Sequence, residues 1–232
     1  MTSELAGAIQ AAFQDCCDRD ASLGERLDAF ADAVRTISAP FAEAVDRLVA
    51  RLQKSVVGTG APQVGDLFPP FYLPDERGHI VRLDELLRNG PVGIVIHRGH
   101  WCPYCRINTR ALAQAWPRIE AVGGQVVAIV PDRQRYAAAI RAEAQATFPV
   151  LTDIDNGFAM SLNLVFWVGS EMKEFMSAAG LDLAAYQGNE SWMVPVPATF
   201  VLSVEGRVKA RFVDPDYRKR MAIESMLEAF AC

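Results

Sequence analysis

Two cysteines, Cys102 and Cys105, stand three positions apart in the segment HRGHWCPYC, residues 97–105. A thiolate at neutral pH is a nucleophile, and a second thiol one helical turn away can close a disulfide with it. Together with His97 and His100, the same cysteines also offer four ligands of the kind that zinc binds. The spacing alone therefore allows a redox centre, a zinc site or a structural cysteine pair.

The cysteine pair lies at a predicted junction between a strand and a helix. PVGIVIH, residues 91–97, is a short apolar run rich in β-branched residues, which is typical of a strand buried on both faces. A helical pattern follows over about residues 103–122 and ends at two glycines. Cys102 is then the N-cap, Pro103 takes the first helical position, and Cys105 lies one turn further on.

This position favours a reactive thiol at Cys102. Unsatisfied N–H groups and the positive end of the helix dipole stabilise a thiolate there and lower its pKa. Arg98 and Arg106 would add to this effect if their side chains point inward. Zinc is disfavoured because strand residues alternate between opposite faces and Pro103 restrains the loop. The redox interpretation is the one we favour, with zinc and a structural pair as alternatives.

The composition predicts one globular domain with an appendage. The chain has 232 residues, is 51% hydrophobic and carries a formal net charge of −5. No basic run offsets this charge, so we expect no nucleic-acid partner. There is no stretch of 18 apolar residues and no leader-like segment, so we expect no membrane association and a cytoplasmic location. An odd number of irregularly spaced cysteines fits a reducing compartment.

The three remaining cysteines carry weaker signals. Cys16 and Cys17 are adjacent in a predicted helix, so their side chains diverge by about 100° and cannot bridge each other. We interpret both as ordinary buried small residues, with a resolving thiol for a second subunit as the alternative. Cys232 ends the chain and is interpreted as a terminal thiol without a function, although it could also resolve.

The N-terminal quarter of the chain predicts helices. Apolar residues recur at helical spacing over residues 5–54, with Asp20 and Ser22 as candidate caps and Pro40 opening a third helix. A Gly- and Pro-rich linker over residues 56–70 follows. We therefore predict a helical extension over residues 1–57 and a domain over residues 58–232. The apolar stripes of the extension need a surface to cover them, and we predict a homodimer through these helices.

The domain alternates strands and helices. A second buried strand is predicted over residues 125–130, and a helix with Asp132 as its N-cap over residues 132–146. A hairpin is predicted from residues 198–203 and 207–213, and a last helix over about residues 217–230. Residues 164–194 are interpreted as a partly helical excursion. This order predicts an α/β layered fold with a mixed central sheet flanked by helices.

Several segments of the chain resemble a known family. WCPYC resembles the active-site loop of thioredoxins, and CPYC is the form found in glutaredoxins. Residues 64–87, 148–164 and 196–208 resemble the opening hairpin, a later segment and the final strand pair of the peroxiredoxin-like branch, the alkyl hydroperoxide reductase/thiol-specific antioxidant (AhpC/TSA) family. The resemblance covers roughly residues 62–230. It implies a thioredoxin-like fold and leaves the N-terminal helices outside.

The chain departs from that family at two positions of the site. Peroxiredoxins carry PxxxTxxC, and ending this pattern at Cys105 puts Arg98 in the Pro position and Cys102 in the Thr position. The resemblance then implies that Cys105 stands where a peroxidatic cysteine stands, and Cys102 where thioredoxins keep the attacking thiol. Peroxiredoxins usually have an arginine where this chain has Pro197, whereas thioredoxins have a proline that docks the substrate. Arg98 could supply the missing positive charge.

Three functions are therefore considered. In the first, a cysteine thiolate reduces a hydroperoxide and the sulfenic acid is resolved to a Cys102–Cys105 disulfide. In the second, Cys102 attacks a protein or glutathione disulfide and Cys105 releases the mixed disulfide. In the third, a module without catalysis binds a partner through Trp101, Tyr104 and Pro197, which are the substrate-binding candidates in the first two.

Both enzymatic functions share one set of partners. Each needs an external thiol reductant, thioredoxin-like or glutathione, to complete its cycle. Without a Rossmann or P-loop glycine pattern, we expect no nucleotide cofactor, and we expect no resident metal. We favour hydroperoxide reduction, with Cys102, Cys105 and Arg98 as the catalytic residues.

Overall fold

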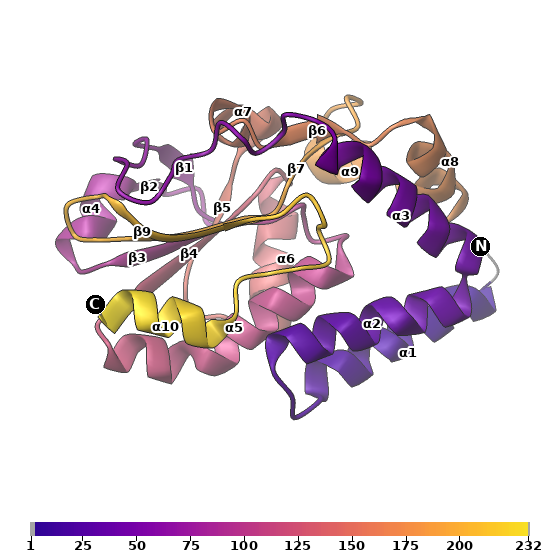
Figure 1. The fold of residues 1–232 in the computed structure, drawn as a ribbon, viewed down its shortest axis with the longest axis horizontal. Coiled ribbons are helices and arrows are strands. Elements are labelled where there is room, and N and C mark those ends of the chain that lie inside the picture. Colours follow the sequence, from indigo (N-terminus) through magenta and orange to yellow (C-terminus); the bar gives the residue numbers. More distant parts are fainter. Residues whose placement is uncertain (1–2, 232) are drawn as a thin grey trace.

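A five-stranded mixed sheet forms the centre of the computed structural model, which describes residues 3–231 (Figure 1). β3 is the middle strand: it pairs in parallel with β4 and antiparallel with β8. β5 extends the sheet in parallel beyond β4, and β9 pairs antiparallel with β8. The strands, in sheet order, are β5 (Val150–Thr152), β4 (Gln125–Val130), β3 (Val92–Ile96), β8 (Ala198–Leu202) and β9 (Val208–Val213). The predicted mixed sheet and hairpin are confirmed.

Helices cover the sheet and bury its β-branched side chains. α5 and α10 contact each other and lie below the sheet in the view of Figure 1. All five residues of β3 are buried, as expected for a strand covered on both faces. The helices of this unit are α4 (Leu83–Arg88), α5 (Pro103–Ala121), α6 (Gln134–Ala144), α7 (Gly157–Ser161, after the short 3-10 turn η1, Ile154–Asn156) and α10 (Ile223–Ala231).

Two small hairpins flank the sheet. The first, β1 (Tyr72–Pro74) with β2 (Ile80–Arg82), lies in the segment that resembles the family's opening hairpin. The second pairs β6 (Val165–Trp167) with β7 (Met193–Pro195) and encloses α8 (Ser170–Ala178) and α9 (Leu183–Gln187). The predicted excursion over residues 164–194 is thus a hairpin with a helical insertion.

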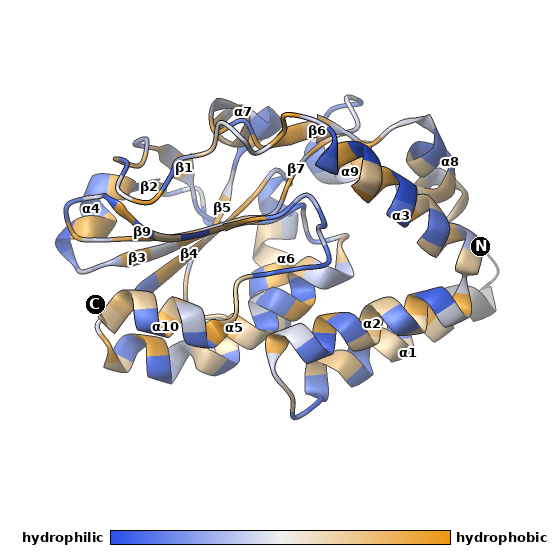
Figure 2. Ribbon diagram, viewed as in Figure 1, coloured by the Kyte–Doolittle hydropathy of each residue, from blue (hydrophilic) through white to orange (hydrophobic). Residues whose placement is uncertain are grey.

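The N-terminal segment, for which the sequence predicted two or three helices, forms three: α1 (Ser3–Asp18), α2 (Leu23–Ile37) and α3 (Ala39–Gln53). Ser22 caps α2 in a reciprocal capping box with Glu25, and Pro40 lies in the first turn of α3. α1 and α2 contact α5, whereas α3 contacts α8. Figure 2 shows the alternation of apolar and polar residues around these helices, whose apolar stripes are covered by the same chain. The homodimer and the division at residue 57 stay predictions.

Two predicted helix starts were wrong. The helix predicted from Asp132 has Arg133 as its N-cap, because the Asp132 side chain instead accepts a hydrogen bond from the His100 N–H at 2.6 Å. The last helix begins at Ile223, and Tyr217 lies in the preceding loop, buried against Tyr104. In both cases a tertiary contact outweighs the local helical pattern.

No helix within residues 3–231 is both long enough and apolar enough to span a membrane.

Candidate active site

The cysteine pair lies where the segment after β3 enters α5. Cys102 is the N-cap of α5 and Pro103 its first residue, as predicted. The Cys105 N–H donates to the Cys102 carbonyl at 3.0 Å, and the two side chains are hydrogen-bonded to each other. Both cysteines are reduced in this structure and almost fully buried, with exposed fractions of 1% and 0%. Local helix geometry thus places two thiols together in a low-dielectric site.

Cys105 receives the groups that stabilise a thiolate. The Arg98 backbone N–H lies 3.3 Å from Cys105 Sγ, and Arg220 Nη2 lies 3.5 Å from it. Burial raises the pKa of Cys105, but hydrogen bonding to Cys102 and His97 and the charge of Arg220 outweigh burial and hold that pKa well below its ordinary value. Cys105 is therefore the thiolate of the pair.

Cys102 has the opposite character. Burial, the hydrogen bond to Cys105 and the negative charge on that sulfur raise the pKa of Cys102 well above its ordinary value. Arg98 and Arg220 act in the other direction without reversing this. The expectation from helix position, a lowered pKa at Cys102, is therefore wrong. The N-terminal end of a helix favours an anion, but the thiolate on Cys105 repels a second negative charge on the neighbouring Cys102 sulfur.

Arg98 is a buried cation held by aromatic rings. Its guanidinium lies 3.8 Å from the centre of the Tyr217 ring and 4.7 Å from that of the Trp101 ring, and the side chain is 2% exposed. Burial opposes its charge, but Cys102, Tyr217 and Cys105 together raise the pKa of Arg98. Arg98 thus keeps a positive charge beside both sulfurs, and its predicted catalytic role stays a prediction.

The hydrogen bonds of His97 define which ring nitrogen can contact Cys105. Thr109 Oγ1 donates to the Cys105 carbonyl at 2.8 Å and lies 3.2 Å from His97 Nε2. Because the hydroxyl hydrogen is already used, Nε2–H must donate to Thr109. His97 Nδ1 has no nitrogen or oxygen partner. Nδ1 is therefore the ring nitrogen left for the hydrogen bond to Cys105.

Asp132 is a buried carboxyl at the end of β4. It is 0% exposed, and burial raises its pKa from 3.8 to about 7, although the His100 N–H stabilises the charge. Gly99 permits this close approach: its φ is +137°, and a Cβ there would lie 2.6 Å from both Asp132 Oδ1 and Trp101 Nε1. Any other residue at position 99 would push the carboxyl and the indole apart.

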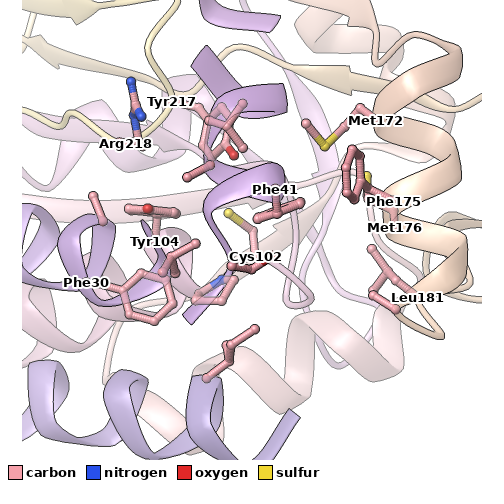
Figure 3. A pocket seen from close by; sticks show the side chains of 18 of the residues that line it. Phe30, Phe41, Cys102, Tyr104, Met172, Phe175, Met176, Leu181, Tyr217 and Arg218 are labelled. Carbon is pink, nitrogen blue, oxygen red and sulfur yellow. The ribbon is translucent and has the colours of Figure 1, made fainter. Parts of the chain in front are cut away.

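A cavity of about 420 Å³ opens beside the cysteine pair. Cys102 lines it, together with Arg98, Trp101 and Tyr104, and Figure 3 shows Cys102 among the rings and methionines that surround the space. Half of the lining residues come from α2, α3 and α8, which lie far from the cysteines in sequence. The wall residues on these helices are Phe30, Ala31, Val34, Arg35, Phe41, Ala42, Val45, Met172, Phe175, Met176 and Ala178.

The structure brings five of the six predicted site residues together: Cys102, Cys105, Arg98, Trp101 and Tyr104. The sixth, Pro197, directly precedes Ala198, which pairs with Ile96 at the end of β3. Pro197 is buried, it is not among the described residues that line the cavity, and no peptide bond in the described chain is cis. Its predicted role in docking substrate therefore stays a prediction.

Other predicted residues lie away from the sulfurs. Arg106 pairs with Glu143 at 2.8 Å, and its guanidinium stacks on Phe13. Cys16 and Cys17 are buried in α1, as expected for ordinary small residues, and burial raises the pKa of Cys17 to about 11. Cys232 lies outside the described residues. Within residues 3–231, no group of three or more His, Cys, Asp or Glu side chains could hold a metal ion.

Arg220, Tyr217 and Asp132 belong to the site but were not predicted for it. Arg220 is 115 residues from Cys105 in sequence, and the loop over residues 214–222 carries both it and Tyr217 to the cysteines. The run DYRKR, residues 216–220, was the one available signal, since a cluster of cations near the end of an acidic chain fits an anionic site.

Comparisons with known proteins agree with this fold. Residues 64–211 match the family described as AhpC/TSA. Among solved structures, the chain is similar to peroxidoxin BcpB from Mycobacterium tuberculosis (20% identity, TM-score 0.56, covering 73% of this chain and 96% of that one). It is also similar to a variant of peroxiredoxin 6 of Arenicola marina (14%, 0.55, 72% and 71%). A third is the bacterioferritin comigratory protein of Xanthomonas campestris, described with alkyl peroxide reduction activity (13%, 0.51, 69% and 89%). No curated protein matches the chain.

Proposed function

The chain belongs to the AhpC/TSA family and is a thiol-dependent oxidoreductase of the peroxiredoxin type; from that premise we propose that it reduces hydroperoxides with Cys105 as the attacking thiolate and Cys102 as the resolving thiol. The observation that carries the assignment is the set of donors on Cys105 Sγ, the Arg98 N–H and Arg220 Nη2. A thiolate held by such donors is the reacting form of a cysteine.

The reaction has two steps. Cys105 S⁻ attacks the terminal peroxide oxygen, which keeps its hydrogen, and the O–O bond breaks to give a sulfenic acid on Cys105. The leaving alkoxide or hydroxide takes a proton from water. Arg98, charged beside both sulfurs, stabilises the negative charge that develops on the leaving oxygen. The Cys102 thiol then attacks the sulfenic sulfur, water leaves, and a Cys102–Cys105 disulfide forms. An external thiol must return the pair to the reduced state.

The disulfide-reductase alternative requires Cys102 to attack first. Its raised pKa leaves little thiolate at neutral pH, so the geometry favours it less. An oxidation experiment separates the two functions. Reduced protein is mixed with equimolar hydrogen peroxide and followed by tryptophan fluorescence, because Trp101 contacts Arg98. We expect oxidation much faster than that of free cysteine. The peroxidase assignment is wrong if hydrogen peroxide oxidises the protein no faster than it oxidises free cysteine, while the protein readily reduces insulin or a glutathione mixed disulfide.

A further inference from the structure

The cavity beside the site reaches one sulfur of the pair. Cys102 is among the described residues that line it, and Cys105 is not. Both cysteines are otherwise closed to solvent, with exposed fractions of 1% and 0%. Figure 3 shows Cys102 among the side chains around this space, so a molecule in the cavity lies next to Cys102.

The wall of the cavity is suited to an apolar molecule without a positive charge. Its volume falls in the range of roughly 300–1,000 Å³ that is usual for small-molecule sites. Met172 and Met176 supply flexible apolar surface that adapts to a ligand. No acidic side chain occurs among the described residues of the wall, and Arg35 and Arg218 are already paired with Asp46, at 2.7 and 2.8 Å. A cationic ligand would leave its charge uncompensated here, because the remaining charged residue of the wall, Arg98, is itself a cation.

We propose that this cavity binds the electron donor of the cycle, an apolar dithiol of low molecular weight without a positive charge that attacks Cys102 in the oxidised protein. The proposal rests on the peroxidase function above and names the chemical class of its reductant.

Because the donor in the cavity lies next to Cys102, reduction of the Cys102–Cys105 disulfide begins at that sulfur. A donor thiolate attacks Cys102 Sγ, a donor–Cys102 disulfide forms, the Cys102–Cys105 bond breaks, and Cys105 leaves as a thiolate. Cys105 is the better leaving group because it is stabilised by Arg220 and the Arg98 N–H. The second donor thiol, as a thiolate, then attacks its own mixed disulfide. Cys102 leaves and takes a proton, the donor closes to a cyclic disulfide, and two electrons have passed to the protein.

Other occupants fit the geometry less well. A peroxide has to reach Cys105, which does not line the cavity. The cysteine of a folded protein donor would have to pass between α2, α3 and α8 to a sulfur that is 1% exposed. The ammonium group of glutathione would find no carboxylate among the described wall residues.

The first test uses the wild-type protein with its disulfide formed by diamide, so that a failure of the peroxidase reaction does not affect the result. Reduction by dihydrolipoamide, a neutral apolar dithiol, is compared with reduction by dithiothreitol and glutathione in stopped flow. We expect dihydrolipoamide to be at least about tenfold faster than either and to saturate with concentration, because burial of its chain adds binding. Equal rates for dihydrolipoamide and dithiothreitol without saturation would overturn the proposal.

Octanamide, an unreactive molecule of similar shape, then tests which half of the cycle uses the cavity. We expect it to slow reduction by dihydrolipoamide and to leave oxidation of the reduced protein by hydrogen peroxide or cumene hydroperoxide unchanged. If octanamide slows oxidation and leaves reduction unchanged, the cavity belongs to the peroxide and the proposal is wrong.

A matched pair of variants on α3 gives an independent test. Ala42 is buried and lines the cavity, whereas Ala50 is exposed on the same helix. Ala42→Phe should lower the rate of reduction by dihydrolipoamide at least about tenfold, and Ala50→Phe should leave it unchanged. If far-UV circular dichroism shows that Ala42→Phe does not fold, Ala31→Phe, at a half-buried wall position on α2, replaces it. A folded wall variant that is reduced at the wild-type rate contradicts the proposal.

Discussion

The two sulfurs of the cysteine pair lie one helical turn apart in quite different surroundings. Cys105 faces donors and charge, with the Arg98 N–H at 3.3 Å and Arg220 at 3.5 Å. Cys102 faces an apolar cavity. One pKa is lowered and the other raised as a result. The CxxC spacing brings two thiols together, but the rest of the chain decides which of them ionises and which of them a ligand can reach.

The surroundings come from opposite ends of the chain. Arg220 and Tyr217 belong to the loop over residues 214–222, beyond the part of the chain that matches the family. Much of the cavity wall comes from α2 and α3, which precede that part. The family-like sheet and α5 thus hold the pair, while the two flanking segments give each sulfur its own environment.

The largest expected effect concerns the stability of the protein and the buried carboxyl of Asp132, which lies at the end of β4. Folding raises the pKa of Asp132 from 3.8 to about 7, so the folded state binds this proton more tightly than the unfolded state. The contribution of Asp132 to the free energy of unfolding is therefore most favourable below pH 4 and falls as pH rises to about 7, by up to about 4 kcal/mol. Asp132→Asn should remove this loss, so that the variant gains stability over wild type at pH 8 but not at pH 4.

Urea unfolding at the two pH values measures this difference. Asp28→Asn, at an exposed position on α2, is the control and should give a small difference that does not depend on pH. If Asp132→Asn changes the free energy of unfolding by the same amount at pH 4 and pH 8, burial does not raise the pKa of Asp132.

Removal of the cation on Cys105 should have the next largest effect. Arg220→Leu should raise the pKa of Cys105 and lower the rate of peroxide oxidation at neutral pH about tenfold, since a charge-assisted hydrogen bond contributes about 1.5–3 kcal/mol. The rate should recover as pH rises. Lys219→Leu, an exposed neighbour, is the control, and a rate–pH profile of Arg220→Leu that matches wild type would argue against this contact.

The smallest expected effect concerns the stability of α2, which lines the apolar cavity beside Cys102. Ser22→Ala should cost about 1 kcal/mol of unfolding free energy, because Ser22 accepts from the Glu25 N–H in the capping box of α2. Ser38→Ala is a matched control, since Ser38 is the N-cap of α3 without a side-chain cap hydrogen bond. Equal losses in the two variants, measured in urea, would show that the capping box does not stabilise the helical extension.

The sequence predicted the frame of the site well. The buried strands, the hairpin, the three N-terminal helices and the N-cap position of Cys102 all follow from local patterns, and the structure confirms them. These features depend on hydrophobic period and on helix-capping preferences, which a sequence displays directly.

The polarity of the pair could not be predicted in the same way. Asp132 follows a strand and precedes a helix, as an N-cap would, yet its carboxyl turns to the His100 N–H. Tyr217 and Arg220 reach the site through a loop whose path depends on contacts more than 100 residues away. The cavity requires α2, α3 and α8 to surround Cys102, and no local pattern encodes that arrangement.

The central claim, that Cys105 attacks and Cys102 resolves, is tested most directly by trapping the sulfenic acid. Reduced Cys102→Ser and Cys105→Ser are each mixed with equimolar hydrogen peroxide and dimedone, and the labelled residue is located by mass spectrometry. The account predicts a dimedone label on Cys105 in Cys102→Ser, formed as fast as wild type oxidises, and no rapid labelling in Cys105→Ser. Rapid labelling of Cys102 in Cys105→Ser, with none in Cys102→Ser, would contradict it.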